Sequence, residues 1–141
     1  MRILAIDYGT KRLGIAVSDE DCTIAFPVSV ETVKSDADAI HRVVAIAAEK
    51  RAGKIIVGLP RNMDGSEGPM AKQVQKFVSN LQSSVTVPVE VLDERLTTAM
   101  AERSLLEGDL SRAKRKKIKD KIAAQMLLQG YLDSLPATDK P

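Results

Sequence analysis

Three acidic residues that lie far apart in the sequence could meet at one site. Asp7 ends the apolar run over residues 3–6, and Glu94 stands just past an apolar stretch over residues 85–92. Reactive sites of open α/β sheets gather outside the carboxyl ends of the strands. If the strands that precede Asp7 and Glu94 are parallel neighbours, we expect both carboxylates to emerge at the same edge of the sheet.

The third acid needs a helix to reach that edge. Spacing of i, i+3, i+7 and i+11 predicts one shared helix face for the residues Asp120, Ala123, Leu127 and Tyr131. This face must pack on the sheet, where an acid is costly unless a cation neutralises it. In the first turn of a helix the macrodipole also favours a carboxylate. We therefore group Asp120 with Asp7 and Glu94.

Three converging carboxylates point to bound metal ions. They would repel one another and raise one another's pKa. A pair of divalent cations about 3.5–4 Å apart removes that penalty; one ion would activate a water for in-line attack, and the other would stabilise the departing oxygen. The ligands are hard oxygens and there is no cluster of Cys and His, so we expect Mg²⁺ or Mn²⁺, two ions, rather than zinc.

Each acid also has a simpler interpretation. Asp7 would cap the turn at Gly9, and Glu94 would pair with Arg95. Asp120 would be only an acid near a helix N-terminus. For each residue alone this interpretation is at least as good as the metal site. The prediction of all three at one edge is what favours the metal site.

The charge of the chain is concentrated in one segment. The net charge is +2, but residues 112–121 (RAKRKKIKDK) carry seven basic residues and one acid, which leaves 14 Lys and Arg against 18 Asp and Glu elsewhere. A mildly acidic body with one basic segment favours a local contact with a polyanion. The alternative is a solvated loop without a specific partner.

Periodicity predicts one α/β domain with a mixed five-stranded sheet. Strands are expected over residues 3–6, 13–17, 23–30, 54–59 and 85–92, and helices over 35–51, from 69 to about 81, from 97 or 98 to 108, and from about 119 to 135. The first three strands would form an antiparallel meander, and the later ones a parallel portion flanked by helices. Pro27 marks an edge strand or a bulge. We expect a single domain over 1–141, with 136–141 as a tail that can fray.

Composition excludes several classes of protein. No apolar run approaches the ~20 residues of a membrane span, and the N-terminus lacks the pattern of a signal peptide. The single Cys22 excludes an internal disulfide framework, fits a reducing compartment, and has no partner His at motif spacing. His41 falls on the polar side of its helix. We expect a cytoplasmic protein.

Four segments together resemble the YqgF family, also described as RuvX-like. They are DYGTKRLGIAVSD (7–19), VGLPRNMDGSEGP (57–69), DERLTTAMAE (93–102) and KDKIAAQMLLQGYLD (119–133), and they cover almost the whole chain in matching order. The first motif alone is weak, but VGLP-x-x-MDG and DER-x-[ST]-T together are specific. The resemblance implies a ribonuclease H-like fold and a carboxylate triad, which maps onto Asp7, Glu94 and Asp120. Neighbouring residues of a strand face opposite sides, so Asp93 is expected to point away from that triad or to support it from behind.

Further residues are hypothesised to contact nucleic acid. They lie in the turn after the first strand, in the 60–69 loop, after Glu94 and in the basic segment: Thr10, Lys11, Arg12, Asn62, Asp64, Ser66, Arg95, Arg112, Lys114, Arg115, Lys116 and Lys117. For the 60–69 loop, a plain turn built by Asp64-Gly65 is an equal alternative, and Arg95 could merely orient Glu94. Exposed aromatics are scarce, and Tyr8 is the best candidate for base stacking.

The resemblance implies a metal-dependent nuclease, with maturation of the 16S ribosomal RNA precursor as the favoured role. A structure-selective DNA nuclease of the Holliday junction resolvase type is the alternative within the same chemistry, and it would need a two-fold dimer. A noncatalytic RNA-binding assembly factor is the alternative from another class. We expect a monomer or weak homodimer, with no membrane partner.

Overall fold

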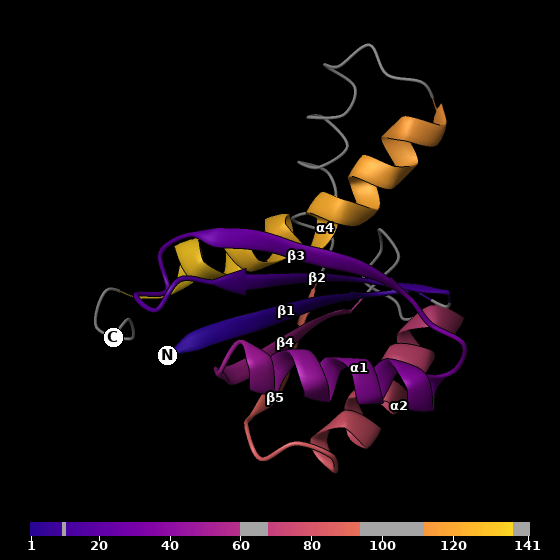
Figure 1. Cartoon of the computed structure of the whole chain (residues 1–141), viewed down its shortest axis with the longest axis horizontal. Coiled ribbons are helices and arrows are strands. Elements are labelled where there is room, and N and C mark those ends of the chain that lie inside the picture. The colour runs from indigo at the N-terminus through magenta and orange to yellow at the C-terminus, as the bar shows by residue number, and fades with distance from the viewer. Residues whose placement is uncertain (10, 60–67, 94–111, 137–141) are drawn as a thin grey trace.

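The computed structural model describes residues 1–9, 11–59, 68–93 and 112–136, with the backbone alone over 112–121. The elements follow one another (Figure 1) as β1 (Arg2–Tyr8), β2 (Arg12–Ser18), β3 (Ala25–Thr32), α1 (Asp36–Glu49), β4 (Ala52–Leu59), α2 (Pro69–Gln82), β5 (Val89–Asp93) and α4 (Arg112–Ser134). The helix expected over 97–108 lies outside the described residues.

The five strands form one mixed sheet in the order β3-β2-β1-β4-β5. β1, β2 and β3 pair antiparallel, whereas β1 and β4, and β4 and β5, pair parallel. The expected mixed sheet with an antiparallel start is confirmed. β1 and β5 are not direct neighbours, because β4 lies between them. The two strands nevertheless run in the same direction, so their carboxyl ends share one edge.

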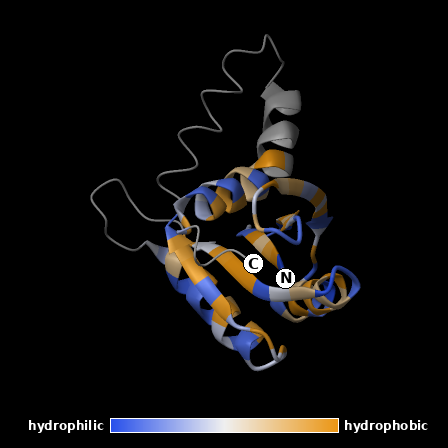
Figure 2. Ribbon diagram, turned by 90° about the vertical axis from the view of Figure 1, so that its left-hand side faces the viewer, coloured by the Kyte–Doolittle hydropathy of each residue, from blue (hydrophilic) through white to orange (hydrophobic). Residues whose placement is uncertain are grey.

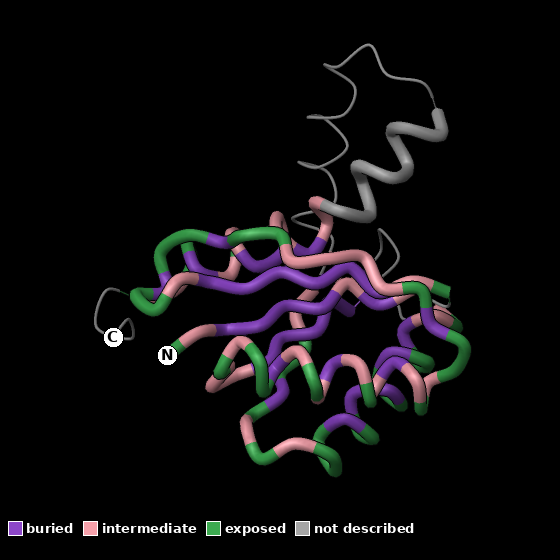
Figure 3. The backbone as a smooth tube through the Cα atoms, in the orientation of Figure 1, coloured by how far each residue is buried: buried purple, intermediate pink, exposed green. Residues whose placement is uncertain are grey.

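The burial of each strand follows its place in the sheet. The central strands β1, β2 and β4 are almost continuously buried (Figure 3), as expected for strands covered on both faces. The edge strand β3 is half-buried or exposed after its first residue, with Phe26 at 49%. Pro27 stands in this edge strand beside a shift in register opposite Ile15 and Ala16, so both features that the proline predicts are present.

Alternation of side chains divides the core into two layers. Leu4, Ile6 and Tyr8 of β1 join the cluster that α1 and α2 cover. Ile3 and Ala5 join the cluster that α4 covers. Figures 1 and 2 show α1 and α2 on one side of the sheet and α4 on the other, with apolar positions (orange in Figure 2) along the strands. We call the second side the α4 face.

Local signals explain the ends of α1 and α2. The Ser35 hydroxyl caps α1 by accepting a hydrogen bond from the Asp38 amide at 3.1 Å. Pro69 occupies the first position of α2, where its missing N–H costs nothing. Both helices lie close to the ranges that the sequence predicts. His41 is exposed on α1, as expected.

Two boundaries differ from the prediction. α4 begins at Arg112 and not near Lys119, so the basic segment is helical. Lys and Arg are good helix formers and no Gly or Pro interrupts the segment, which explains the longer helix. β5 begins at Val89 and not at Val85, because Pro88 has no N–H to donate; its carbonyl accepts from the Ile55 amide at 2.9 Å.

α4 packs across β1, β2 and β3 through one apolar stripe. The stripe consists of Ala124, Leu128 and Leu132, each with an exposed fraction of 0%, and Leu127 beside them is 1% exposed. The face predicted from Ala123, Leu127 and Tyr131 is thus displaced by about one residue around the helix, since Ala123 and Tyr131 are only half-buried. None of the described helices has the length and hydropathy of a membrane-spanning segment.

Candidate active site at the carboxyl edge of the sheet

Asp7 is the last residue but one of β1 and lies at the carboxyl edge of the sheet. Strand alternation puts it on the α4 face with Ala5 and Ile3, and it is half-buried. Acidic side chains are rare at such positions. This residue is therefore the one described acid that strand geometry places between the carboxyl edge and α4.

Glycines flank Asp7 on the α4 face. Gly14 of β2 is its direct antiparallel partner. On the other side Ile6 pairs with Val57, so Asp7 and Gly58 are the next residues of β1 and β4. Neither glycine carries a side chain that could fill the space beside the carboxylate.

β5 continues the same row beyond Gly58. Leu92 is the parallel partner of Gly58 and packs on the α4 side of the core. Asp93 is the partner of Leu59, which belongs to the opposite layer, so alternation puts Asp93 on the α1 and α2 side. This placement agrees with the expectation that Asp93 points away. Glu94 and Arg95 follow at once and lie outside the described residues.

Asp120 is described by its backbone alone. It belongs to α4 and stands one helical turn before Ala124, the first residue of the stripe that packs on the sheet. Among the side chains that the structure describes, no three His, Cys, Asp or Glu gather closely enough to hold a metal ion. Of the three proposed ligands, only Asp7 has a described side chain; the side chains of Glu94 and Asp120 are outside the described set.

The turn between β1 and β2 holds the next residues of the site. The Gly9 amide donates to the Arg12 carbonyl at 2.9 Å, and a Cβ on Gly9 would lie 2.7 Å from that oxygen. Only glycine fits this close approach. Lys11 is exposed and its carbonyl accepts from the Val33 amide at 2.9 Å, which fixes the turn against the start of α1.

Tyr8 is not available for base stacking, so that prediction is wrong. The residue is 9% exposed, and its ring packs on Phe77 with 4.9 Å between centroids. The hydroxyl donates to the Asp36 carboxylate at 2.7 Å. Burial, followed by this hydrogen bond and the charge of Asp36, raises the pKa of the phenol to about 12. Strand alternation explains the outcome, because the neighbour of Asp7 must point into the opposite layer.

The remaining nucleic-acid candidates are only partly placed. Thr10, Asn62, Asp64, Ser66 and Arg95 lie outside the described residues. Arg112, Lys114, Arg115, Lys116 and Lys117 lie on the first turns of α4, where only the backbone is described. In Figure 1 this part of α4 extends beyond the sheet.

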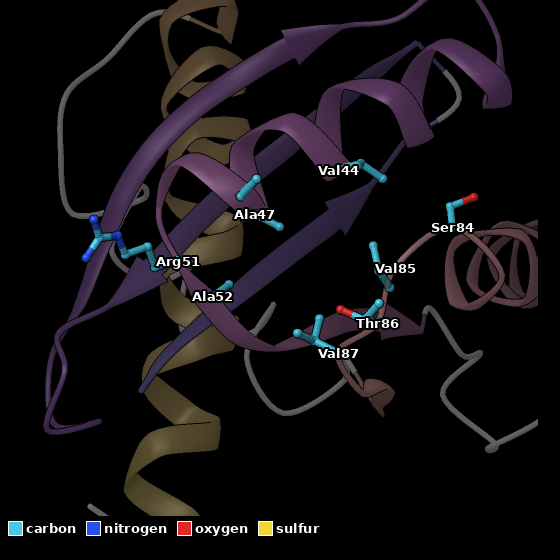
Figure 4. A pocket seen from close by; sticks show the side chains of 9 residues that line it. Val44, Ala47, Arg51, Ala52, Ser84, Val85, Thr86 and Val87 are labelled. Carbon is cyan, nitrogen blue, oxygen red and sulfur yellow. The ribbon is translucent and has the colours of Figure 1, made fainter.

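A cavity of about 290 Å³ lies at the opposite end of β4 from the acidic edge. It is lined mostly by small apolar residues between the end of α1 and the segment before β5 (Figure 4): Val44, Ala47, Ala48, Arg51, Ala52, Ser84, Val85, Thr86 and Val87. Arg51 extends away from Val85 and Val87 in this view. None of the described residues that line the cavity is acidic, and none of them belongs to the candidate site.

Sequence reasoning missed two features of the α4 face. Gly14 and Gly58 beside Asp7 become visible only with the strand register. A polar cluster of Lys54, Glu90 and Tyr131 joins β4, β5 and α4. Tyr131 was predicted only as an apolar-face residue, and the period-two placement of Lys54 and Glu90 on one face was the available signal.

Solved structures with this arrangement define the class of protein. The Holliday junction resolvase of fowlpox virus matches with a TM-score of 0.58 and 17% identity over 96% of this chain and 100% of that chain. RuvC of Thermus thermophilus matches with a TM-score of 0.55 and 14% identity over 95% and 98%. At such identities the likeness concerns the fold. The protein has the ribonuclease H-like fold that the sequence resemblance implied.

Sequence comparison then gives the family. The profile described as "RuvX: Holliday junction resolvase" matches residues 1–134. A protein of Caldanaerobacter subterraneus named "Putative pre-16S rRNA nuclease" is 46% identical over 95% of this chain and 97% of its own length. One of the same name from Bacillus pumilus is 46% identical over 96% and 99%. The chain belongs to the RuvX family and is a nuclease, a hydrolase that acts on nucleic acid.

Proposed function

We propose that the chain is a two-metal nuclease that trims the precursor of 16S ribosomal RNA, with Asp7, Glu94 and Asp120 as metal ligands. The observation that carries this proposal is the position of Asp7: half-buried at the carboxyl edge, on the α4 face and between two glycines. A cationic partner stabilises an acid that is partly removed from water, and the glycines on both sides of Asp7 add no side chain that would obstruct a divalent ion.

The strand order fits the size of a two-metal centre. β1 and β5 are separated by β4 alone, which corresponds to about 9–10 Å between their axes. Two ions about 4 Å apart, each about 2 Å from its ligand oxygens, span about 8 Å. An acid on β1 and an acid just after β5 are therefore near enough to share such a centre.

The residues of this chain would share the work as follows. Asp7 at the end of β1, Glu94 just after β5 and Asp120 on α4 would together hold the ions. Divalent ions bound there supply activation of the attacking water and neutralisation of charge on the departing oxygen. Gly14 and Gly58 leave room for the sugar–phosphate backbone next to Asp7. Lys11 and Arg12 extend from the turn that follows Asp7.

The basic start of α4 would bind the rest of the substrate. Seven of the ten residues over 112–121 are basic, and their helix extends beyond the sheet next to position 120. Such a segment contacts phosphates without reading sequence, so it adds affinity for any polynucleotide. The proposed choice of ribosomal RNA rests on the names of the relatives that are 46% identical.

A binding experiment tests the metal site. We expect Mn²⁺ to raise the melting temperature of the wild type, and Asp7→Asn to lose this stabilisation together with cleavage. Asp21→Asn is the matched control, because Asp21 is an exposed acid in the turn between β2 and β3. Mn²⁺ stabilisation that persists in Asp7→Asn would remove Asp7 from the ligand set. Absence of both stabilisation and cleavage in the wild type would favour a noncatalytic RNA-binding factor.

A cleavage experiment tests the substrate. Wild-type protein is incubated with a 5′-extended 16S precursor RNA and, separately, with a four-way DNA junction. We expect cuts in the RNA near the mature 5′ end. The family description and the fold of viral and bacterial resolvases favour the junction as the second candidate. Symmetric cuts in the junction by a protein that is dimeric in solution would support that alternative instead.

A further inference from the structure

A polar cluster on the α4 face connects the last helix to the parallel strands β4 and β5. The Lys54 ammonium lies 2.8 Å from Oε1 of Glu90 and donates to the Tyr131 hydroxyl at 2.5 Å. The Tyr131 hydroxyl in turn donates to Oε2 of Glu90 at 3.5 Å. The same ammonium lies 5.1 Å from the centroid of the Tyr131 ring. We call these three residues the α4 clamp.

The clamp is a defined contact and not a loose surface pair. The Lys54 side chain is 20% exposed. Partial burial lowers the pKa of its ammonium, but the hydrogen bonds to Glu90 and Tyr131 and their charges outweigh this effect and raise the pKa above its usual value. The Tyr131 ring also packs against the apolar layer under α4. The Lys54 and Tyr131 side chains are therefore held in partly buried positions, whereas the Glu90 side chain is 51% exposed.

A second set of hydrogen bonds holds the other flank of α4. The Gln129 side chain accepts from the Ala25 amide at 2.9 Å and donates to the Thr23 carbonyl at 3.0 Å. Gln125 donates to the Ala25 carbonyl at 3.2 Å. These bonds tie α4 to the edge strand β3, whereas the clamp ties it toward β4 and β5. The apolar packing between the two flanks holds α4 on the sheet, and the hydrogen bonds on both flanks add directional contacts to this packing.

The direction of α4 decides where Asp120 lies. Position 120 is eight residues before Leu128, the fully buried centre of the stripe, which is about 12 Å along the helix. A tilt of about 5° around Leu128 would move position 120 by about 1 Å. Metal-binding constellations tolerate about 0.5 Å. A small change at the clamp would thus disturb the far end of the helix.

We propose that the α4 clamp is a positioning device, which sets the tilt of the last helix so that Asp120 reaches the metal centre at Asp7. This inference rests on the proposed function, because it takes Asp120 as a metal ligand. Lys54, Glu90 and Tyr131 are positioning residues and touch neither the metal nor the substrate. Their contribution is transmitted along α4.

The test uses the intact chain and Mn²⁺ as the probe. Tyr131→Phe removes the hydroxyl and keeps the ring, and Glu90→Gln removes the charge of a half-exposed side chain. In each variant we expect the Mn²⁺ Kd, measured by titration calorimetry, to rise about 10-fold, the low end for residues that orient metal ligands. We expect kcat to fall while KM for a precursor RNA stays unchanged, since the basic start of α4 still binds the substrate.

Ser134→Ala is the matched control. It also removes a hydroxyl from the end of α4, but this hydroxyl donates to the Tyr131 carbonyl, within the helix, at 2.7 Å. We expect the Mn²⁺ Kd of the wild type. Lys54→Glu should weaken Mn²⁺ binding, and the exchange of both charges in Lys54→Glu with Glu90→Lys should recover most of the loss. A Ser134→Ala protein as weak as Tyr131→Phe, or no recovery in the exchange, would overturn the clamp.

Asp120→Asn distinguishes the two ways in which this inference could fail. If Asp120→Asn weakens Mn²⁺ binding but Tyr131→Phe and Glu90→Gln bind like the wild type, the positioning role is overturned and the proposed metal site stands. If Asp120→Asn itself binds Mn²⁺ like the wild type, the proposed ligand set is wrong, and the clamp has no ligand to position.

Discussion

Asp7 of β1 pairs directly with Gly14 of β2, so the nearest residue to this carboxylate across the β1–β2 ladder has no side chain. On the β4 side Gly58 occupies the next place. Three successive strands thus present glycine, aspartate and glycine at one level of the α4 face. In the proposed metal site, a side chain on either glycine would compete for space with a metal-bound phosphate.

Substitutions of Gly14 should therefore lower activity more than stability. Paired residues on one face have Cβ atoms about 4.5–5.5 Å apart, so Gly14→Ala and then Gly14→Val bring carbon progressively closer to the Asp7 carboxylate. We expect a graded loss of cleavage and of Mn²⁺ affinity. Glycine inside a strand is itself unfavourable, so Gly14→Ala should change the free energy of unfolding by less than about 1 kcal/mol. Full activity in Gly14→Val would mean that the substrate does not approach there.

The buried stripe of α4 should dominate the stability of its attachment. Leu128 has an exposed fraction of 0%, and Leu128→Ala is expected to lower the free energy of unfolding by about 2–5 kcal/mol because a cavity remains. Urea denaturation followed by circular dichroism measures this loss. His41→Ala, at an exposed position of α1, serves as the comparison and should be close to neutral. A neutral Leu128→Ala would contradict the packing of α4 on the sheet.

The phenol of Tyr8 should resist ionisation. Its pKa is raised from the usual 10.0 to about 12, first by burial and then by the hydrogen bond to Asp36. Because the folded state holds the neutral form, Tyr8 contributes stability that is complete below pH 10 and is lost as the pH rises toward 12.

Spectroscopic titration of a single tyrosine checks this prediction. The chain has two Tyr, so Tyr131→Phe leaves Tyr8 alone. We expect phenolate absorbance to appear near pH 12 or together with alkaline unfolding, whichever comes first. The same variant in concentrated urea should titrate near pH 10, as a free phenol does. If the folded protein formed phenolate near pH 10, as the unfolded protein in urea does, this result would contradict the buried hydrogen bond.

The basic start of α4 should determine the salt dependence of nucleic-acid binding. Arg115→Ala with Lys116→Ala is expected to weaken binding and to reduce the slope of log Kd against log salt by about 0.7–0.9 for each lost phosphate contact. Lys72→Ala with Lys76→Ala removes the same charge from exposed positions of α2 and is the matched control. If the slope of log Kd against log salt were the same for both double variants, residues 112–121 would have no special part in binding nucleic acid.

Much of the fold follows from local patterns in the sequence. Alternation and apolar runs predicted the antiparallel start and the buried strand β4, and helical spacing together with Ser35 and Pro69 predicted α1 and α2. The first seven residues of α4 were not predicted as helix, although Lys and Arg favour helices. The late start of β5 came from Pro88, which interrupts an otherwise apolar stretch.

The sequence by itself determined which chemical groups this protein has: Asp7 at a strand end, an acid after β5, and Asp120 in a helix with a basic start. Only the tertiary structure decided how these groups are spaced. It inserted β4 between β1 and β5, put Tyr8 in the core behind Asp7, and joined Lys54 and Glu90 to Tyr131. The physical reason is that periodicity records which side of a strand or helix is apolar, whereas strand order and helix tilt arise from contacts between residues distant in the chain.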